Sequence, residues 1–362
     1  MYIYTNPNWP NFKWDENLIL ESMMHVKYTH GKLLGRMESI GLIPQKESIL
    51  TTISQDVLKS NEIEGEFLDA DQVRSSVARR IGLDIAGLKD SKPRIDAIVK
   101  MTMDAMHHFD APLTKERLFS WHKLLLAQTR EKMIIGNWRD DKTGPLQVIS
   151  GVIGRLKIHF EAPPANNLPH EMEMFLDWFN TRHDMDYMIK AAIAHLWFVT
   201  LHPFDDGNGR IARVIADMCL ARLENSDKRF YSMSSQIRIE RKEYYNMLET
   251  TQKGGLDITK WLLWFLNCLH SAMKNTDGTL ADVLTKARFW QKHSGVEMSA
   301  RQINVMNLML DKTTHNINSS AYAKLAKCSQ DTAHRDILDL VDKGVFGMSE
   351  SKGRSMSYGV IF

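Results

Sequence analysis

The chain has 362 residues, of which 43% are hydrophobic and 25% charged, a composition typical of a soluble protein with room for two or three domains. The formal net charge of +2 gives no indication of a nucleic-acid or membrane partner for the chain as a whole. The three widely spaced cysteines exclude a disulfide framework, and neither a signal peptide nor a long apolar run is present. We therefore expect a cytoplasmic protein that does not span a membrane.

The first residues, with Trp9, Phe12 and Trp14 among Pro and Asn, predict an irregular arm lying on the body of the protein. Asp15 is a suitable cap for a helix that begins near Glu16, and Gly41 with Pro44 separates this helix from a second one through residue 58. Apolar spacing of three to four predicts further helices near residues 93–109, 114–129, 169–182, 186–201, 210–223, 240–253 and 257–274. The fold class is therefore mainly α.

Two short strand-like runs interrupt this helical pattern, at residues 144–151 and 156–160, and they predict a β-hairpin. A hairpin alone among helices is either a small structural cap or a flap whose free edge binds another segment.

The stretch 275–278 predicts a boundary, followed by a separate C-terminal unit. Helical patterns at 299–311 and 319–327, and a third helix capped by Ser329, precede a strand pair at 345–348 and 357–361. Three helices and a wing that contains Lys352 and Arg354 predict a winged helix-turn-helix domain.

The most informative segment runs from His202 to Arg213 and reads His-Pro-Phe-Asp-Asp-Gly-Asn-Gly-Arg-Ile-Ala-Arg. It forms the turn between two helices, so the amides of Gly207 and Gly209 at a helix N-terminus make a nest suited to phosphates. Arg210 and Arg213 project near one face of the first turn, where a bound anion would compensate their unfavourable interaction with the helix dipole.

Three further side chains of this segment supply what a transfer reaction needs. Asp206 is a hard oxygen ligand for Mg²⁺, and Asn208 adds a side-chain donor beside the nest. His202 is a base able to accept a proton from an attacking hydroxyl. A base, a metal carboxylate, an anion nest and two arginines in twelve residues indicate phosphoryl or nucleotidyl transfer.

The segment resembles the Fic family motif HPFx(D/E)GNGRxxR, and every specified position is filled. The resemblance implies a helical core with a β-hairpin flap and the transfer of AMP from ATP to Ser, Thr or Tyr hydroxyls of proteins. It implies that His202 is the general base, that Asp206 holds Mg²⁺, and that the remaining motif residues bind ATP, namely Phe204, Gly207, Asn208, Gly209, Arg210 and Arg213.

The same resemblance assigns nucleoside contacts to a later helix with the pair Tyr244 and Tyr245, which from the residues alone are equally well core or interface aromatics. It makes the hairpin at 146–160 a flap that pairs with an extended segment of the protein target. It also implies homodimers as a common state of the branch that carries a winged helix.

Ser60-Asn61-Glu62-Ile63-Glu64-Gly65 ends the second helix, with Gly65 as a C-terminal cap. On its own this is a solvated acidic helix end. However, it resembles the family's inhibitory pattern (S/T)xxxE(G/N), with Ser60, Glu64 and Gly65 at the matching positions. The resemblance implies that Glu64 pairs with Arg213 and excludes the γ-phosphate of ATP.

The expected organisation is an N-terminal helical extension at 1–90, a catalytic core at 91–275 and a winged-helix domain at 285–362. Alternative functions are removal of AMP by the same site, transfer of another phosphate-containing group, or DNA-binding regulation by the winged helix. The acidic residues of its third helix are unfavourable for contact with DNA phosphates, so docking to protein or dimerisation is at least as well supported as DNA binding.

Overall fold

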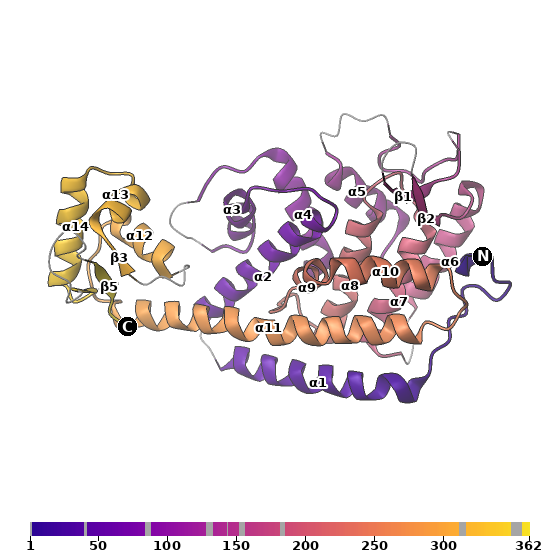
Figure 1. The fold of residues 1–362 in the computed structure, drawn as a ribbon, viewed down its shortest axis with the longest axis horizontal. Helices are drawn as coiled ribbons and strands as arrows, with labels where there is room; N and C mark the ends of the chain where they lie inside the picture. The colour runs from indigo at the N-terminus through magenta and orange to yellow at the C-terminus, as the bar shows by residue number, and fades with distance from the viewer. Residues whose placement is uncertain are drawn as a thin grey trace.

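The computed structural model describes residues 2–39, 42–83, 88–127, 133–142, 144–151, 156–181, 185–310, 316–348 and 357–362. The protein is mainly helical, as predicted (Figure 1). The helices up to the end of the core are α1 (Glu16–Glu38), α2 (Leu42–Ile63), α3 (Ala70–Arg80), α4 (Pro93–His107), α5 (Lys115–Leu125), α6 (Leu168–Asn180), α7 (Tyr187–Leu201), α8 (Asn208–Glu224), α9 (Met233–Ile239), α10 (Arg241–Gln252) and α11 (Thr259–Lys292). The short helices α3 and α9 have no counterpart among the sequence predictions.

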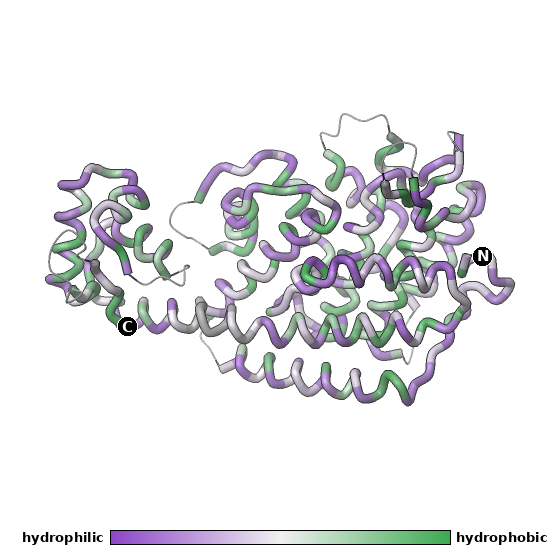
Figure 2. The backbone as a smooth tube through the Cα atoms, viewed as in Figure 1, coloured by the Kyte–Doolittle hydropathy of each residue, from purple (hydrophilic) through white to green (hydrophobic). Residues whose placement is uncertain are grey.

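The N-terminal arm lies on the core, as expected. Trp9 and Phe12 pack edge-on against Trp197 of α7 at 6.0 and 5.8 Å between ring centroids. Asp15 then caps α1 by accepting hydrogen bonds from the amides of Asn17 and Leu18. From this start α1 runs alongside α11 (Figure 1), and hydrophobic and hydrophilic residues are interspersed along α1 and along the first half of α11 (Figure 2).

Helix α2 begins earlier than the sequence indicates. Pro44 was expected between two helices but lies inside the first turn of α2. Proline is tolerated there, since the first-turn amides have no partner within the helix. The helix ends at Ile63, and Gly65 takes a left-handed φ of +86° that turns the chain away. Glu64 therefore stands at the end of a long helix that crosses the core.

Helices α7 and α8 form the centre of the molecule. All residues of α7 after Tyr187 are buried, and so is most of α8. The helices pack against each other and carry the short loop 202–207 between them (Figure 1). The loop is thus fixed at both ends by buried helices.

The hairpin is formed by β1 (Gln147–Ser150) and β2 (Lys157–Glu161), which pair antiparallel. The register shifts after Val148, which pairs with Phe160, whereas Ile149 pairs with Ile158. His159 is consequently the extra residue of a bulge. The ring of Phe160 is buried and packs against the ring of Tyr2, with 5.2 Å between their centroids. The N-terminal arm therefore packs against the hairpin.

Helix α11 has no break in secondary structure at 275–278, where the sequence predicts a boundary, but continues through this stretch and ends only at Lys292. Asn, Thr and Gly each cost less than about 1 kcal/mol in a helix interior, and packing at both ends outweighs this cost. Its first half packs on α1, whereas Phe289 near its end is buried in a second hydrophobic core.

That second core belongs to the C-terminal unit, whose elements lie close to the predicted positions. They are α12 (Ala300–Leu310), β3 (Asn316–Ile317), α13 (Ser319–Ala326), α14 (Gln330–Asp342), β4 (Phe346–Met348) and β5 (Tyr358–Val360). Ser329 caps α14, and the strands form a sheet in the order β3-β5-β4. Lys352 and Arg354, expected in the wing, lie outside the described residues.

No helix in the described part of the chain is long and apolar enough to cross a membrane.

Candidate functional site

The loop between α7 and α8 has an unusual backbone at both ends. His202 takes a left-handed conformation with φ of 49°, and Gly207 has φ of +85°. A Cβ added at Gly207 would lie 2.7 Å from Cδ2 of Leu125, so both the backbone and the space require glycine. The turn brings His202 and the N-terminus of α8 to the same side of the core.

Asn208 holds this loop closed through its side chain. Its Nδ2 donates to the carbonyl of Phe204 at 2.7 Å, and its Oδ1 accepts from the amide of Phe204 at 3.0 Å. The ring of Phe204 is fully buried and stacks on His122 with 4.0 Å between centroids. In this structure Phe204 and Asn208 shape the loop, and both polar groups of the Asn208 side chain are occupied.

Two residues that no sequence motif singles out also hold the loop. Nδ1 of the buried His122 accepts from the amide of Gly136 at 2.9 Å, so its Nε2 carries the proton that is donated to the carbonyl of Asp206 at 3.1 Å. Nε of the buried Arg139 donates to the carbonyl of His202 at 2.8 Å. Burial lowers the pKa of His122, which matches its neutral, structural role.

The His202 ring is oriented by a backbone contact. Its Nδ1 lies 3.2 Å from the carbonyl of Val199, an acceptor only, so Nδ1 carries the proton and Nε2 carries the lone pair. Burial lowers the pKa of His202 to about 4, although the hydrogen bond to Val199 opposes this shift. A neutral ring with a free acceptor nitrogen is the form that a general base needs.

Asp206 and Arg210 form an ion pair at the start of α8. Oδ1 of Asp206 accepts from the amide of Gly207 at 2.6 Å, and its Oδ2 accepts from Nη2 of Arg210 at 2.9 Å. Nη1 of Arg210 also pairs with Glu66 at 3.0 Å. The Asp206 side chain is half exposed, whereas that of Arg210 is 2% exposed.

Arg213 is the most enclosed charged group of the site, with 2% of its side chain exposed. Its Nε donates to Oγ of Ser60 at 2.9 Å, and its Nη2 donates to the carbonyl of Ser60 at 2.8 Å and to Oε1 of Glu64 at 2.7 Å. The structure thus joins Ser60 of α2, and Glu64 just after its end, to the second turn of α8. Nη1 of Arg213 is buried without a hydrogen-bond partner.

The Glu64 carboxylate is held from the other side by α10. The hydroxyl of Tyr245 lies 3.1 Å from Oε2 of Glu64, and Nε of Arg241 donates to the carbonyl of Ile63 at 2.7 Å. Burial alone would raise the pKa of Glu64, but the charge and hydrogen bond of Arg213 outweigh it and lower the pKa. Glu64 is therefore an anion, seated so close to Gly209 that a Cβ there would collide with it.

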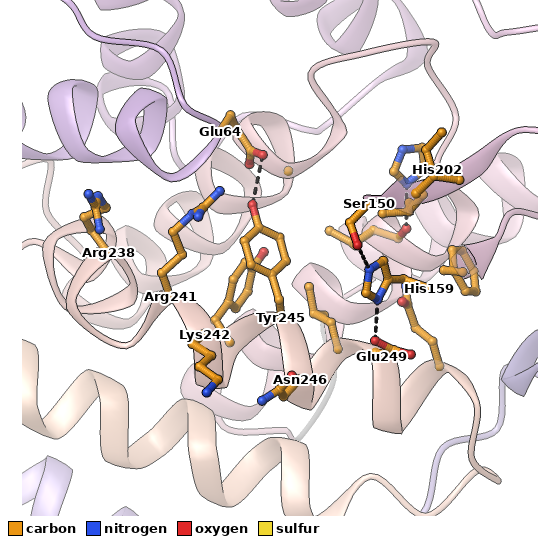
Figure 3. Close-up of a pocket in the computed structure, with 18 residues that line it drawn as sticks. Glu64, Ser150, His159, His202, Arg238, Arg241, Lys242, Tyr245, Asn246 and Glu249 are labelled. Carbon is orange, nitrogen blue, oxygen red and sulfur yellow. Dashed lines mark hydrogen bonds and ion pairs between the residues drawn. The ribbon is translucent and has the colours of Figure 1, made fainter. Parts of the chain in front are cut away.

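A cavity of about 700 Å³ opens beside these groups (Figure 3). It lies between the hairpin on one side and α10 on the other, and His202, Glu64 and Gly209 reach it from the core. Arg238, Arg241 and Lys242 line it from the side of α9 and α10. The cavity is large enough for a nucleotide and combines apolar walls with groups that bind anions.

The two tyrosines of α10 differ in their surroundings. Tyr244 is buried, and its hydroxyl lies 2.9 Å from Nε2 of His195, which is itself buried in the core. Tyr245 is partly exposed and points toward Glu64 across the cavity (Figure 3). Both line the cavity, whereas Asp206, Arg210 and Arg213 are not among its lining residues; Arg213 is joined to it through its ion pair with Glu64.

Comparison with known families gives two matches. Residues 112–220 match the Fic/DOC family, and residues 2–83 match a domain of unknown function, DUF4172. The first match contains the loop 202–207 and the start of α8, and the second contains α2 with Glu64.

Curated relatives carry the name protein adenylyltransferase Fic. The one from Nematostella vectensis is 22% identical over 236 residues, which is 63% of this chain and 49% of the relative. The one from Drosophila willistoni is 25% identical over 225 residues, which is 60% of this chain and 40% of the relative. The match with this chain spans less than half the length of these relatives.

Solved structures share the fold. A Fic family protein from Desulfovibrio desulfuricans superposes with a TM-score of 0.56 at 19% identity, covering 95% of this chain and 96% of that one. A Fic-domain signaling protein from Bacteroides thetaiotaomicron gives 0.52 at 20% identity, covering 73% and 97%.

Proposed function

We propose that this chain, in which residues 112–220 match the Fic/DOC family, is an adenylyltransferase that moves AMP from ATP to Ser, Thr or Tyr hydroxyls of proteins and is restrained by Glu64. The observation that carries the proposal is the position of His202. The His202 ring, whose Nε2 is unprotonated, lines the cavity. Gly209, in the first turn of α8, lines the same cavity. A proton acceptor and a phosphate site thus share one cavity.

The reaction follows from this arrangement. The target hydroxyl oxygen attacks the α-phosphorus of ATP while His202 Nε2 takes its proton, and the bond from the α-phosphorus to the bridging oxygen breaks to release pyrophosphate. Arg139 and Val199 fix the backbone and ring of His202, so little reorganisation is needed.

The start of α8 would hold the triphosphate. The amides of Gly207 and Gly209 and the positive end of the helix favour anions, and Arg210 and Arg213 add full charges. Asn208 and Phe204 would act by keeping the loop in the shape that presents these groups. We assign the γ-phosphate to Arg213, whose Nη1 is buried without a hydrogen-bond partner.

Asp206 is the residue that would hold Mg²⁺. Its half-exposed carboxylate is the kind of single ligand that Mg²⁺ uses when phosphates and water complete the shell. When bound, Mg²⁺ would neutralise charge on the phosphates.

The nucleoside and the target have separate places in this proposal. Tyr245, and behind it Tyr244, form the wall of the cavity on which a base and ribose would lie. Strand β1 is exposed along its whole length and offers a free edge to an extended target segment. Docking by backbone hydrogen bonds would place a hydroxyl near His202 with few demands on the target's sequence.

Glu64 would act as a brake, because it occupies Arg213 and fills the space over Gly209. A γ-phosphate and the Glu64 carboxylate would be like charges competing for one guanidinium. ATP would then bind with its α-phosphorus turned away from the attacking hydroxyl.

The expected organisation remains part of the proposal: a helical extension at 1–90, a catalytic core at 91–275 and a winged-helix docking or dimerisation unit at 285–362, in a cytoplasmic protein. In that unit Arg301 forms two hydrogen bonds with Asp336, and Lys343 pairs with Asp339. With these cations neutralised, a protein partner fits better than DNA.

Labelled ATP tests the activity. Purified protein, as wild type and as Glu64→Gly, is incubated with a cell lysate, Mg²⁺ and ATP that carries the label on either the α- or the γ-phosphate. Adenylylation predicts protein labelling from the α position only. Labelling from the γ position would instead indicate kinase-type transfer, and none from either position would refute the proposal.

A further inference from the structure

Three side chains outside the catalytic motif form a continuous hydrogen-bonded chain at the flap. Oγ of Ser150, at the end of β1, lies 2.6 Å from Nε2 of His159 on β2. Nδ1 of the same ring lies 2.5 Å from Oε2 of Glu249 on α10. All three line the cavity that His202 also lines, and Figure 3 shows them in a row on the flap side.

The direction of each hydrogen bond can be assigned. Hydrogen bonds from Lys253 and His159 lower the pKa of Glu249 to about 2, so it is a carboxylate and accepts only. Nδ1 of a neutral His159 must then carry the proton, which leaves Nε2 as an acceptor. The Ser150 hydroxyl donates to it. Hydroxyl, imidazole and carboxylate thus stand in the order that activates a serine nucleophile.

The bulge in β2 creates this arrangement. Val148 pairs with Phe160 and Ile149 with Ile158, so His159 has no partner across the ladder and contacts Ser150 and Glu249 instead. Bulges often redirect a side chain toward an active site. Ser150 is exposed and His159 keeps 27% of its side chain accessible, so a ligand in the cavity can reach the hydroxyl.

We propose that Ser150 is an internal acceptor of the nucleotidyl group, with His159 as its base and Glu249 as the residue that positions His159. Ser150 Oγ attacks the α-phosphorus of ATP, its proton passes to His159 Nε2, and the bond to the bridging oxygen breaks to release pyrophosphate. The product is an O-adenylyl serine on the flap. This inference rests on the proposed adenylyltransferase activity.

The test measures modification of the peptide that contains Ser150. Full-length protein, as wild type and as Glu64→Gly, is incubated with Mg²⁺ and ATP labelled at the α-phosphate, digested, and mapped by mass spectrometry. We expect one AMP on Ser150 in Glu64→Gly, none in Ser150→Ala, and retention in Ser150→Thr, which keeps a hydroxyl. Replacing the base in His159→Asn should slow the modification about a hundredfold.

Lys253→Ala is the matched control. Nζ of Lys253 pairs with Oε1 of Glu249 at 2.7 Å but does not belong to the hydrogen-bonded chain of Ser150, His159 and Glu249. The rate of modification in this variant should therefore stay within about twofold of that in its parent. Glu249→Gln should slow it by about tenfold or more without changing the affinity for ATP, because only the orientation and charge balance of His159 are lost.

The outcomes separate the two proposals. AMP on other residues or on lysate proteins, with the Ser150 peptide unmodified, would overturn the assignment of Ser150 and leave the enzyme proposal standing. An equal rate of Ser150 modification in His159→Asn and its parent would overturn the assignment of His159 as the base. Absence of transfer to any protein in either background would overturn the adenylyltransferase proposal and this inference with it.

Discussion

Glu64 Oε1 and Arg213 Nη2 lie 2.7 Å apart, which joins the end of α2 to the second turn of α8 across 149 positions of sequence. Arg213 is buried, and three of its hydrogen bonds go to Ser60 and Glu64. Because Glu64 already neutralises this guanidinium, a phosphate would compete with the Glu64 carboxylate for it. Predictions about regulation start from this contact.

Replacing Glu64 with Gly should increase adenylylation, including self-adenylylation, because Arg213 becomes available and the space over Gly209 opens. The affinity for ATP should rise more than that for ADP, since ADP lacks the phosphate that competes with Glu64. Calorimetry and transfer from ATP labelled at the α-phosphate measure both effects. Wild-type rates and unchanged ATP affinity in the folded variant would make Glu64 an ordinary acidic helix end.

The double variant Glu64→Gly, Arg213→Ala should lose much of this gain. In the single variant the released arginine aligns the triphosphate, and in the double variant no group replaces it. Rates measured at saturating ATP separate alignment from binding. A double variant as active as Glu64→Gly would show that Glu64 acts by filling space alone.

The low pKa of His202 predicts an unusual pH dependence. With a pKa of about 4 caused by burial, the ring stays neutral down to pH 5.5, so the single-turnover rate there should lie within about twofold of the rate at pH 7.5. A histidine with its usual pKa near 6.5 would lose about tenfold over this range. A tenfold loss of the single-turnover rate at acid pH in the wild type would contradict the buried, neutral base.

His202→Ala should abolish transfer to an added protein while ATP binding persists.

Much of the fold could be predicted because its signals are local. Asp15 and Ser329 cap helices where their sequence positions indicate, and Gly207 and Gly65 take the positive φ that glycine allows. The continuity of α11 could not be predicted from the sequence, since only packing at both ends explains a helix through 275–278. Helices α3 and α9 are short, and their apolar pattern is correspondingly weak.

In the candidate site, too, some residues could be predicted from the sequence and others could not. The residues from 202 to 213 are contiguous, so their chemistry is visible in the sequence, whereas His122 and Arg139 support the loop from 63 or more positions away. Nothing in the local pattern around either residue indicates this contact. The meeting of Glu64 with Arg213 was expected only through the family resemblance.

The free edge of the flap can be tested with proline. The amide of Ala162 donates to the carbonyl of Leu146, and because antiparallel pairs alternate, the backbone N–H of Gln147 faces away from β2. Gln147→Pro should therefore weaken transfer to protein targets about tenfold without changing ATP affinity. Gln147→Ala, which loses only the side-chain bond to Glu161, is the control. Equal losses in both variants would exclude pairing through this edge.

The last prediction concerns the anchor that sets α2, and with it Glu64, against the core. The buried Arg229 pairs with Asp56 of α2 at 2.5 Å and with Asp217 of α8 at 2.6 Å. Arg229→Met should lower the free energy of unfolding by about 3–5 kcal/mol, because it leaves two buried carboxylates without their counter-charge. Urea unfolding measures this change.

Arg238→Met is the comparison, since Arg238 is 40% exposed, pairs with Glu62 at 3.5 Å, and should cost less than about 1 kcal/mol. The loss in Arg229→Met should also depend on pH. Burial raises the pKa of Asp217 to about 6 even beside Arg229, and without the arginine its folded-state pKa rises further above the unfolded value. A raised folded-state carboxyl pKa stabilises at low pH and loses that contribution as pH increases, so the deficit should be larger at pH 8 than at pH 5. If Arg229→Met loses no more free energy of unfolding than Arg238→Met, or if its loss is independent of pH, the ion pairs of Arg229 do not hold α2 against the core.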